Sequence, residues 1–356
     1  MTEHSHPDSI ILPNVEGKRL SIIIPMYKVE DFVERCIRSL EDQDIPSQEY
    51  EIICIEDGSP DDCSKIVKNL QKEFDNIVLS EQENQGVSLA RNNGFAKAAG
   101  KYVVFIDPDD YVEPNRLADI LSTTEHSNAE VSFLPFTVLR EDGSVGSRIF
   151  RRQYESGIYS GIEAYALARG DGRTDPDRMW AILFEREFII RNSLYFLPGV
   201  PYLEDGELIA RTLCVADRCI FTGQSFYMRT TRPQSATNSD LYYSDKATNG
   251  FISAGKNLKK FQNETNLNGK QMQFLNQPIV KFVTLAVDST GGRRSSQRYK
   301  RTVQALRSCG LSKVNIKGCN LEYWLCGFLY NISPWLGGLM LNLYTGVKRI
   351  THFSRL

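Results

Sequence analysis

The stretch Tyr102-Val103-Val104-Phe105-Ile106-Asp107-Pro108-Asp109-Asp110 decides the fold class, because five apolar or aromatic residues lead straight into three carboxylates. Such a run is typical of a strand that is buried on both faces in the middle of a parallel sheet. Pro108 cannot continue the hydrogen-bond ladder, so we expect the strand to end there. Open α/β sheets bind ligands at the carboxyl ends of their strands, so the acids lie where a ligand site is expected. Taken alone, they fit a Mg²⁺ or Mn²⁺ site and an Asx-rich turn equally well.

The first 121 residues alternate between apolar runs and segments with apolar residues at helical spacing. The runs predict strands at residues 21–25, 51–55, 76–79 and 102–106, and the other segments predict helices near 32–40, 66–74, 87–99 and 114–121. Four strand–helix repeats at this spacing are typical of a parallel sheet with right-handed crossovers. We therefore predict an α/β fold with a mostly parallel central sheet and flanking helices.

The pattern is coarser after residue 121. We expect strands at 130–139 and 179–184, a hairpin-like turn at 141–144, helices at 185–191 and from 203 to about 215, and edge strands at 219–221 and 225–229. From residue 246 onward the periodicity indicates helices, with a break at 263–269.

Composition limits the class of protein. A chain of 356 residues is long enough for two domains, or for one large domain with an appendage. A net charge of −2 and a pI of about 6.2 provide no global basic field, so we expect no nucleic acid partner. Eight cysteines without a C-x-x-C pair fit a reducing cytosol better than a disulfide framework. The polar residues 1–18 predict a flexible lead and no signal peptide, so we expect cytoplasmic localisation.

Several nucleotide-binding signatures are absent from the sequence. No G-x-G-x-x-G follows an apolar run, and Gly100-Lys101-Tyr102 is no P-loop because no Ser or Thr follows the lysine. No Gly-rich loop follows the first predicted strand, which disfavours a sugar nucleotidyltransferase. Polar side chains nevertheless end three neighbouring strands, at Asp57, Asn84 and Asp107. These ends would meet in one crevice that could hold a nucleotide through its base and ribose, with a metal on its phosphates.

Four stretches of the sequence, in this order, resemble the glycosyltransferase family 2 domain, which is of the GT-A type. They are Ser21-Ile22-Ile23-Ile24-Pro25-Met26-Tyr27, Asp57-Gly58-Ser59-Pro60-Asp61, Asn84-Gln85-Gly86-Val87-Ser88-Leu89-Ala90-Arg91-Asn92 and Phe105-Ile106-Asp107-Pro108-Asp109-Asp110. Each is weak alone, but four in order are a strong signal. The clear match covers residues 19–121, and a looser one through Met179-Trp180 and Tyr202-Leu203-Glu204-Asp205 extends to about residue 239.

The resemblance is to enzymes that build bacterial surface polysaccharides, such as capsule, O-antigen or exopolysaccharide. It implies a Rossmann-like GT-A domain at residues 19–240, with a nucleotide-binding half at 19–121 and an acceptor half at 122–240, followed by a C-terminal helical region at 241–356. It also implies an inverting, metal-dependent transfer of one hexosyl group from a nucleotide sugar, for which we expect a UDP-sugar. The acceptor would be a saccharide or a lipid-linked saccharide. The departures are Lys28, which stands where the family commonly has asparagine, Glu56, which replaces a frequent aspartate, and Pro108, which fills a position that is usually small.

The resemblance also implies roles for individual residues. Pro25 and Tyr27 would line the base pocket, Asp57 would accept a hydrogen bond from the base edge, Asn84, Gly86 and Arg91 would lie along the nucleotide and donor sugar, and Asp107 would contact the ribose. Asp109 would bind Mg²⁺ or Mn²⁺, Asp110 would support that site or touch the donor sugar, and Asp205 would be the general base. A divalent ion suits a diphosphate leaving group, and a carboxylate can take the proton of an acceptor hydroxyl.

Several of these residues could instead have purely structural roles. Asp205 alone is typical of an acid that satisfies a helix N-terminus, and Arg91 could simply brace its helix. Trp180 would be a core residue rather than an acceptor platform, and Arg229 and Arg232 would be surface cations rather than phosphate ligands. For the whole chain, the alternatives are a sugar nucleotidyltransferase and a non-catalytic nucleotide-binding scaffold.

The segment between Glu322 and Lys348 carries no charge and is rich in apolar and aromatic residues. It is long enough to span a bilayer, but polar residues, a proline and two glycines interrupt it near the middle. We therefore expect two short amphipathic helices in a membrane interface, with peripheral contact through residues 321–356 at the inner face of the cell membrane. A packed helical hairpin or a homodimer interface is the alternative. A basic cluster that would add attraction to anionic lipid consists of Arg293, Arg294, Arg298, Lys300 and Arg301.

Overall fold

The computed structural model describes residues 17–149, 157–172, 175–223, 225–231, 240–292 and 294–353. The chain folds into two compact units. The sheet unit consists of the chain up to residue 159 together with 178–196 and 217–231, and the helical unit consists of 160–177, 197–216 and 232–356. Most of the predicted flexible lead lies outside the described residues, and the predicted domain boundary at residue 240 stays a prediction.

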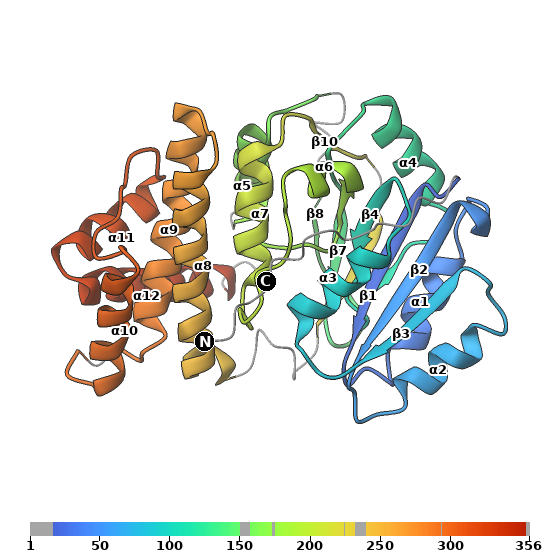
Figure 1. The fold of residues 1–356 in the computed structure, drawn as a ribbon, viewed down its shortest axis with the longest axis horizontal. Coiled ribbons are helices and arrows are strands. Elements are labelled where there is room, and N and C mark those ends of the chain that lie inside the picture. Colours follow the sequence, from blue (N-terminus) through green and yellow to red (C-terminus); the bar gives the residue numbers. More distant parts are fainter. Residues whose placement is uncertain are drawn as a thin grey trace. The chain divides into compact units, whose positions relative to one another are not determined.

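The sheet unit is built on a seven-stranded sheet with the strand order β10-β6-β9-β4-β1-β2-β3 (Figure 1). Its strands are β1 (Leu20–Met26), β2 (Tyr50–Asp57), β3 (Ile77–Gln82), β4 (Tyr102–Phe105), β6 (Val131–Phe133), β9 (Ile182–Glu185) and β10 (Cys219–Phe221). The pairs β1–β2, β2–β3, β1–β4 and β6–β10 are parallel, and β9 runs antiparallel to β4 and β6. The predicted mostly parallel central sheet is therefore confirmed, with the opening stretch on the central strand β4.

Helices cover both faces of this sheet. They are α1 (Val33–Glu41), α2 (Cys63–Leu70), α3 (Val87–Lys97), α4 (Leu117–His126) and α6 (Arg186–Arg191), with the short 3₁₀ turn η1 (Ser47–Glu49). Alternate β1 residues such as Ile22 and Ile24 share one apolar core with α1, α2 and α4. Ile23 points to the other face, where α3 packs so closely that a Cβ on Gly94 would lie 2.5 Å from the Ile23 side chain. Glycine at this position therefore permits the close approach of α3.

A second sheet of four strands lies in the same unit, in the order β5-β11-β7-β8. Its strands are β5 (Tyr111–Val112), β7 (Phe136–Leu139), β8 (Val145–Ile149) and β11 (Tyr227–Thr230). The hairpin-like turn predicted at 141–144 joins β7 to β8. Two predictions are wrong here. The segment 130–139, predicted as one strand, forms two strands in different sheets, separated at Pro135, which has no N–H for the ladder. The strand β11, predicted as an edge strand, is an interior strand because it pairs with both β5 and β7.

The helical unit consists, in its described part, of α5 (Gly161–Gly172), α7 (Glu204–Val215), η4 (Asp240–Tyr243), α8 (Asp245–Glu264), α9 (Gly269–Asp288), α10 (Gln297–Ser308), α11 (Leu321–Ile332) and α12 (Pro334–Phe353). The predicted break at 263–269 is confirmed, and Asn268 there caps α9. The α11–α12 hairpin packs on α9, where a Cβ on Gly338 would lie 2.8 Å from the Val287 side chain and a Cβ on Gly327 would lie 3.1 Å from the Val280 side chain. Among the described residues, no helix is long and apolar enough to cross a membrane.

Candidate functional site

The acid turn, defined as Asp107–Asp110, follows the carboxyl end of β4. A hydrogen bond from Asp110 N to Asp107 O closes it at 3.0 Å. The first acid is fixed from α3, because Arg91 Nη2 lies 3.0 Å from Asp107 Oδ1. Arg91 is buried, and its guanidinium lies 5.0 Å from the centroid of the Phe196 ring. Arg91 therefore fixes the side chain of Asp107 from α3, independently of any contact with a ligand.

Asp110 is the buried member of the acid turn, with 3% of its surface exposed. The Tyr227 hydroxyl donates to its Oδ2 at 2.6 Å, and the Thr230 N–H donates to its Oδ1 at 2.7 Å. Burial and the carboxylates of Asp107 and Asp109 raise the pKa of Asp110 to about 7. Of the two roles expected for Asp110, this burial favours support of the turn over contact with a sugar.

Asp109 is partly exposed, and its backbone is held from two sides. Its carbonyl oxygen accepts from Arg35 Nη2 at 2.7 Å and from Thr230 Oγ1 at 2.8 Å. The Arg35 guanidinium also lies 4.8 Å from the centroid of the Tyr111 ring. Because both bonds go to the carbonyl, they fix the main chain of Asp109 without involving its carboxylate.

These residues fit a divalent cation that is completed by a substrate. No group of three His, Cys, Asp or Glu side chains in the described chain forms a metal site by itself. Mg²⁺ is usually held by one or two carboxylates together with substrate phosphates, and the partly exposed Asp109 supplies one carboxylate. The pKa of Asp110 is raised first by burial and then by the carboxylates of Asp107 and Asp109, and a cation would offset that second effect.

The ends of β2 and β3 are joined around Asp57. Its Oδ1 accepts from Gln82 Nε2 and from Gln85 N, both at 2.8 Å, and its Oδ2 accepts from Gly86 N at 2.9 Å. Asn84 Nδ2 donates to the Asp57 carbonyl at 2.8 Å. The structure therefore brings the predicted residues Asp57, Asn84 and Gly86 together, and the Asp57 carboxylate shapes the loop that leads into α3.

The end of β1 carries the two residues predicted for the base pocket. Pro25 is buried in the strand, beyond Ile23, where the pairing with β4 ends, so its missing N–H breaks no bond on that side. Tyr27 follows the strand and is 45% exposed. Lys28 has a φ of +56°, in the left-handed region that asparagine tolerates better than lysine. Its N–H donates to Ser59 Oγ, which ties the loop after β1 to the loop after β2.

Asp205 lies in the first turn of α7, in the helical unit, and is partly exposed. The residue before the helix, Leu203, has a φ of +58°, a strained conformation for a residue with a branched side chain. Behind Asp205, a Cβ on Gly206 would lie 2.9 Å from Asp177 Oδ1. Asp177 is in turn paired with the buried Lys281 of α9. The N-terminus of α7 is thus packed tightly against a buried ion pair of its own unit.

Sequence reasoning missed the residues that hold the acid turn from elsewhere in the sheet unit, namely Arg35, Thr230 and Tyr227. None of them belongs to a recognisable motif. For Arg35, the helical spacing of its neighbours predicted a helix, but it gave no indication of a contact with the acid turn. Trp180 is half-buried and stacks on the Tyr227 ring at 4.9 Å, which fits the packing role offered for it. Arg229 lies over Trp180, 5.8 Å from the ring centroid, and Arg232 lies outside the described residues.

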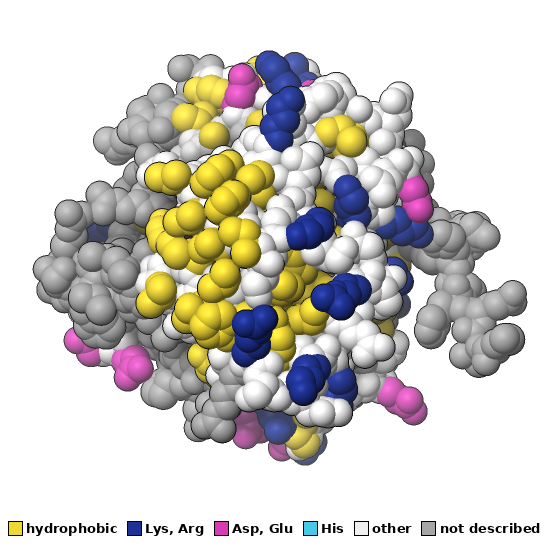
Figure 2. All heavy atoms as spheres, turned by 90° about the vertical axis from the view of Figure 1, so that its left-hand side faces the viewer, with side chains coloured by type: hydrophobic (Ala, Val, Ile, Leu, Met, Phe, Trp, Pro, Cys, Tyr) yellow, Lys and Arg dark blue, Asp and Glu magenta, His cyan; other side chains and the backbone are white. Residues whose placement is uncertain are grey.

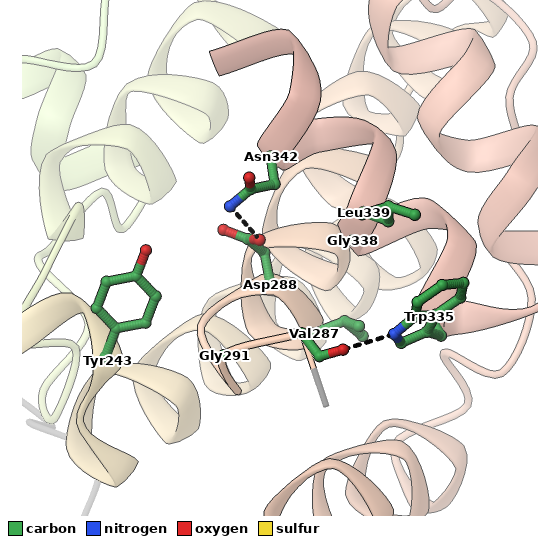
Figure 3. A pocket seen from close by; sticks show the side chains of 9 residues that line it. Tyr243, Val287, Asp288, Gly291, Trp335, Gly338, Leu339 and Asn342 are labelled. Atoms are coloured by element: carbon green, nitrogen blue, oxygen red, sulfur yellow. Dashed lines mark hydrogen bonds between the residues drawn. The ribbon is translucent and has the colours of Figure 1, made fainter. Parts of the chain in front are cut away.

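A separate pocket of about 450 Å³ opens in the helical unit between η4, the end of α9 and α12 (Figure 3). Asn342 Nδ2 donates to Asp288 Oδ1 at 3.1 Å, and Trp335 Nε1 donates to the Gly292 carbonyl at 2.8 Å. Burial raises the pKa of Asp288. The described lining has no cationic side chain and none of the residues predicted to bind the nucleotide sugar, so we do not assign the donor to it.

The architecture is that of a GT-A protein. A 1–349 fragment of Staphylococcus aureus TarS, crystallised in complex with UDP-GlcNAc, matches with a TM-score of 0.64 at 16% identity, over 91% of this chain and 92% of that one. At this identity the likeness shows the fold alone. Residues 21–179 match the family model described as Glycosyl transferase family 2.

Two curated relatives extend the match beyond this segment. The uncharacterized glycosyltransferase EpsJ of Bacillus subtilis is 29% identical over 228 residues, which is 61% of this chain and 62% of the relative. The uncharacterized glycosyltransferase YibD of Escherichia coli is 30% identical over 211 residues, which is 59% of this chain and 60% of the relative. The match thus covers about three fifths of the length of each of these relatives.

Proposed function

We propose that this chain is an inverting, metal-dependent glycosyltransferase that moves one hexosyl group from a nucleotide sugar to an acceptor hydroxyl during the synthesis of a bacterial surface polysaccharide. The acid turn is the observation that carries the proposal. Its backbone and Asp110 are held by Tyr227 and Thr230, while Asp109 is partly exposed at the carboxyl end of the central strand. An Asx-rich turn without a function would not need such support from a second sheet.

The donor is proposed to be a UDP-sugar. The TarS fragment with the same fold holds UDP-GlcNAc in its crystal structure, which supports a nucleotide sugar of this class here. In this chain Tyr27 offers an exposed aromatic ring for a base, and Asp57 shapes the adjoining loop. Asp107, fixed by Arg91, would contact the ribose, and Asp109 would hold Mg²⁺ or Mn²⁺ together with the diphosphate.

The chemistry requires stabilisation of the leaving group and removal of a proton from the acceptor. A divalent cation bound at Asp109 would stabilise the charge that develops on the nucleoside diphosphate. Arg91 and Tyr227 keep Asp107 and Asp110 in place, so the carboxylates need not reorganise during the reaction. Asp205 would accept the proton of the acceptor hydroxyl as it attacks from the face opposite the leaving group, which inverts the anomeric centre.

The acceptor is proposed to be a saccharide, including a lipid-linked one. A relative from Campylobacter jejuni, 34% identical over 115 residues, is named GalNAc(5)-diNAcBac-PP-undecaprenol beta-1,3-glucosyltransferase. That name gives a lipid-linked saccharide as the acceptor of this relative, which supports the proposal. Such an acceptor would bring this enzyme to the inner face of the cell membrane.

Incubation with a panel of nucleotide sugars and either Mg²⁺ or Mn²⁺ tests the proposal through the release of nucleoside diphosphate. We expect release with at least one UDP-sugar and its loss in Asp109→Asn. Asp205→Asn should abolish transfer to an acceptor while leaving the binding of UDP unchanged. Asp142→Asn, in the exposed turn between β7 and β8, is the matched control and should keep full activity. Unchanged transfer in both site variants would refute the mechanism, and pyrophosphate release from a nucleoside triphosphate and a sugar 1-phosphate would indicate a nucleotidyltransferase instead.

A further inference from the structure

The exposed apolar side chains of this protein concentrate on one hairpin. Of the twelve large hydrophobic residues that are exposed in the described chain, six lie on α11 and α12, and the other six are scattered over the remaining elements. We call these six the α11–α12 face: Leu321, Trp324, Phe328, Ile332, Leu339 and Leu343. Figure 2 looks onto this side of the helical unit and shows hydrophobic side chains gathered there. Clustering of this kind is typical of a surface that meets a partner.

The face follows from the helical spacing of α11. Its four members on α11 recur at positions 321, 324, 328 and 332, so they form one stripe along the helix. The opposite side of the same helix packs into the core through Tyr323, Cys326 and Tyr330. A soluble surface helix would place charged residues on its outer stripe, whereas here the Trp324 and Phe328 rings stack on one another at 5.3 Å on the outside. The stripe therefore has no function in holding the hairpin to α9.

The charge of the C-terminal segment indicates what binds to the α11–α12 face. From Ser289 to the last residue the sequence has eleven Lys and Arg against a single acid, Glu322, although the whole chain is net −2. Glu322 is itself buried and paired with Arg169 at 2.8 Å. The exposed cations of this segment in the described chain include Arg294, Lys300, Arg301, Arg307, Lys313 and Lys317. Figure 2 shows Lys and Arg side chains beside the apolar face.

We propose that the α11–α12 face docks on an anionic lipid surface, with its apolar side chains in the interface and the surrounding cations on the headgroups. An amphipathic hairpin lying in the plane of the interface gains both apolar burial and attraction to anionic lipid. Self-association through the same face would bring two strongly cationic segments together, so the charge disfavours a homodimer there. The surface is independent of the proposed transfer reaction, although a lipid-linked acceptor would give it a purpose.

Co-sedimentation of the full chain with vesicles tests this proposal without any measurement of activity. We expect binding to phosphatidylcholine vesicles that contain phosphatidylglycerol, much weaker binding to phosphatidylcholine alone, and weakening as salt is added. The double variant Leu321→Glu/Ile332→Glu alters the two most exposed members, at 81% and 62%, and should reduce partitioning at least about tenfold. Val78→Glu/Val145→Glu, which alters exposed apolar residues of the sheet unit, is the matched control and should bind like the wild type.

A second pair of substitutions keeps the test decisive if the first variant folds poorly. Lys300→Glu/Arg301→Glu lies on α10 and leaves the apolar face intact. It should weaken binding by at least about fivefold for each of the two cations, because it removes two positive charges and adds two negative ones. The proposal is overturned if the wild type ignores anionic vesicles, or if both double variants bind like the wild type. It is also overturned if the wild type is a dimer in solution that Leu321→Glu/Ile332→Glu converts to a monomer, because the face would then be a self-interface.

Discussion

Replacement of Tyr227 by phenylalanine tests whether the acid turn is held from the second sheet. The ring of Tyr227 is fully buried and stacks on Trp180, so the variant should keep its packing and lose only the hydroxyl. That hydroxyl donates to Asp110 Oδ2 at 2.6 Å and accepts from Asp107 N at 3.3 Å. The substitution therefore removes one strong and one long hydrogen bond from both ends of the turn.

The expected loss follows from the groups left without these partners. A buried polar group that loses its partner costs roughly 1–3 kcal/mol, and the longer bond contributes less than the short one. Asp110 keeps its bond from Thr230 N, so we expect the free energy of unfolding to fall by about 2–4 kcal/mol. The bond from Tyr227 also lowers the pKa of Asp110 against the effect of burial. Because only the ionised carboxylate depends strongly on that donor, the loss should be larger above pH 7 than below it.

Urea unfolding in metal-free buffer, followed at two pH values, measures this effect. Tyr50→Phe is the matched control: Tyr50 is also buried in the sheet unit, and its hydroxyl donates to Glu41 Oε2 at 2.8 Å, outside the acid turn. The control should lose about 1 kcal/mol. A loss in Tyr227→Phe no larger than in the control, or one that is independent of pH, would refute the account of the acid turn.

Two further predictions concern charged groups. In the folded protein Asp110 keeps its proton up to about pH 7, whereas the unfolded chain releases it near pH 4, so the free energy of unfolding should fall as the pH rises through that window, by up to about 1.4 kcal/mol per pH unit. Asp110→Asn should remove this slope, and an identical slope in the variant would contradict the assignment. Lys281→Met should destabilise the helical unit by about 1–3 kcal/mol, because it removes the cation shared by Asp175 and Asp177, although Asp175 keeps its ion pair with Arg169. Thermal unfolding measures this loss, which Asp177→Asn in the same chain should partly restore; equal stability of the single variant and the wild type would count against it.

The central sheet was predictable because buried parallel strands are continuous apolar runs. Each run at 21–25, 51–55, 76–79 and 102–106 corresponds to one of the first four strands, and the helices between them follow from apolar spacing. The second sheet was not predictable in this way. Its strands β5 and β11 are short, and their pairing joins Tyr227 to Val112 across more than a hundred residues, so no local pattern indicates it.

In the candidate site, too, some features follow from local sequence patterns and others depend on contacts between distant residues. The positions of Asp57, Asn84 and Asp107 near strand ends are local properties. The prediction of neighbouring strands holds for β2 and β3, which Asp57 ends and Asn84 follows, whereas β1 separates them from β4 and Asp107. Their supports are not local. Arg35 reaches Asp109 from α1, and Tyr227 reaches Asp110 from a strand of the other sheet, so neither could be found from spacing.

The helices α5 and α7 lie in the sequence between segments of the sheet unit, but they belong to the helical unit. The helical unit is therefore larger than the C-terminal region that the sequence suggested. Periodicity indicates that the segment after residue 203 is a helix, but it cannot indicate which core the helix joins. In the structure α7 packs with the C-terminal helices: Glu207, which is fully buried, accepts from Asn257 Nδ2 of α8 at 2.7 Å and pairs with Arg211 at 2.8 Å. Asp177, which packs against Gly206, is held by Lys281 of α9. Removal of the C-terminal helices would therefore expose the buried charges of α7 and release its first turn, which carries Asp205. The helical region is thus part of what positions the proposed general base, whether or not its outer face also meets lipid.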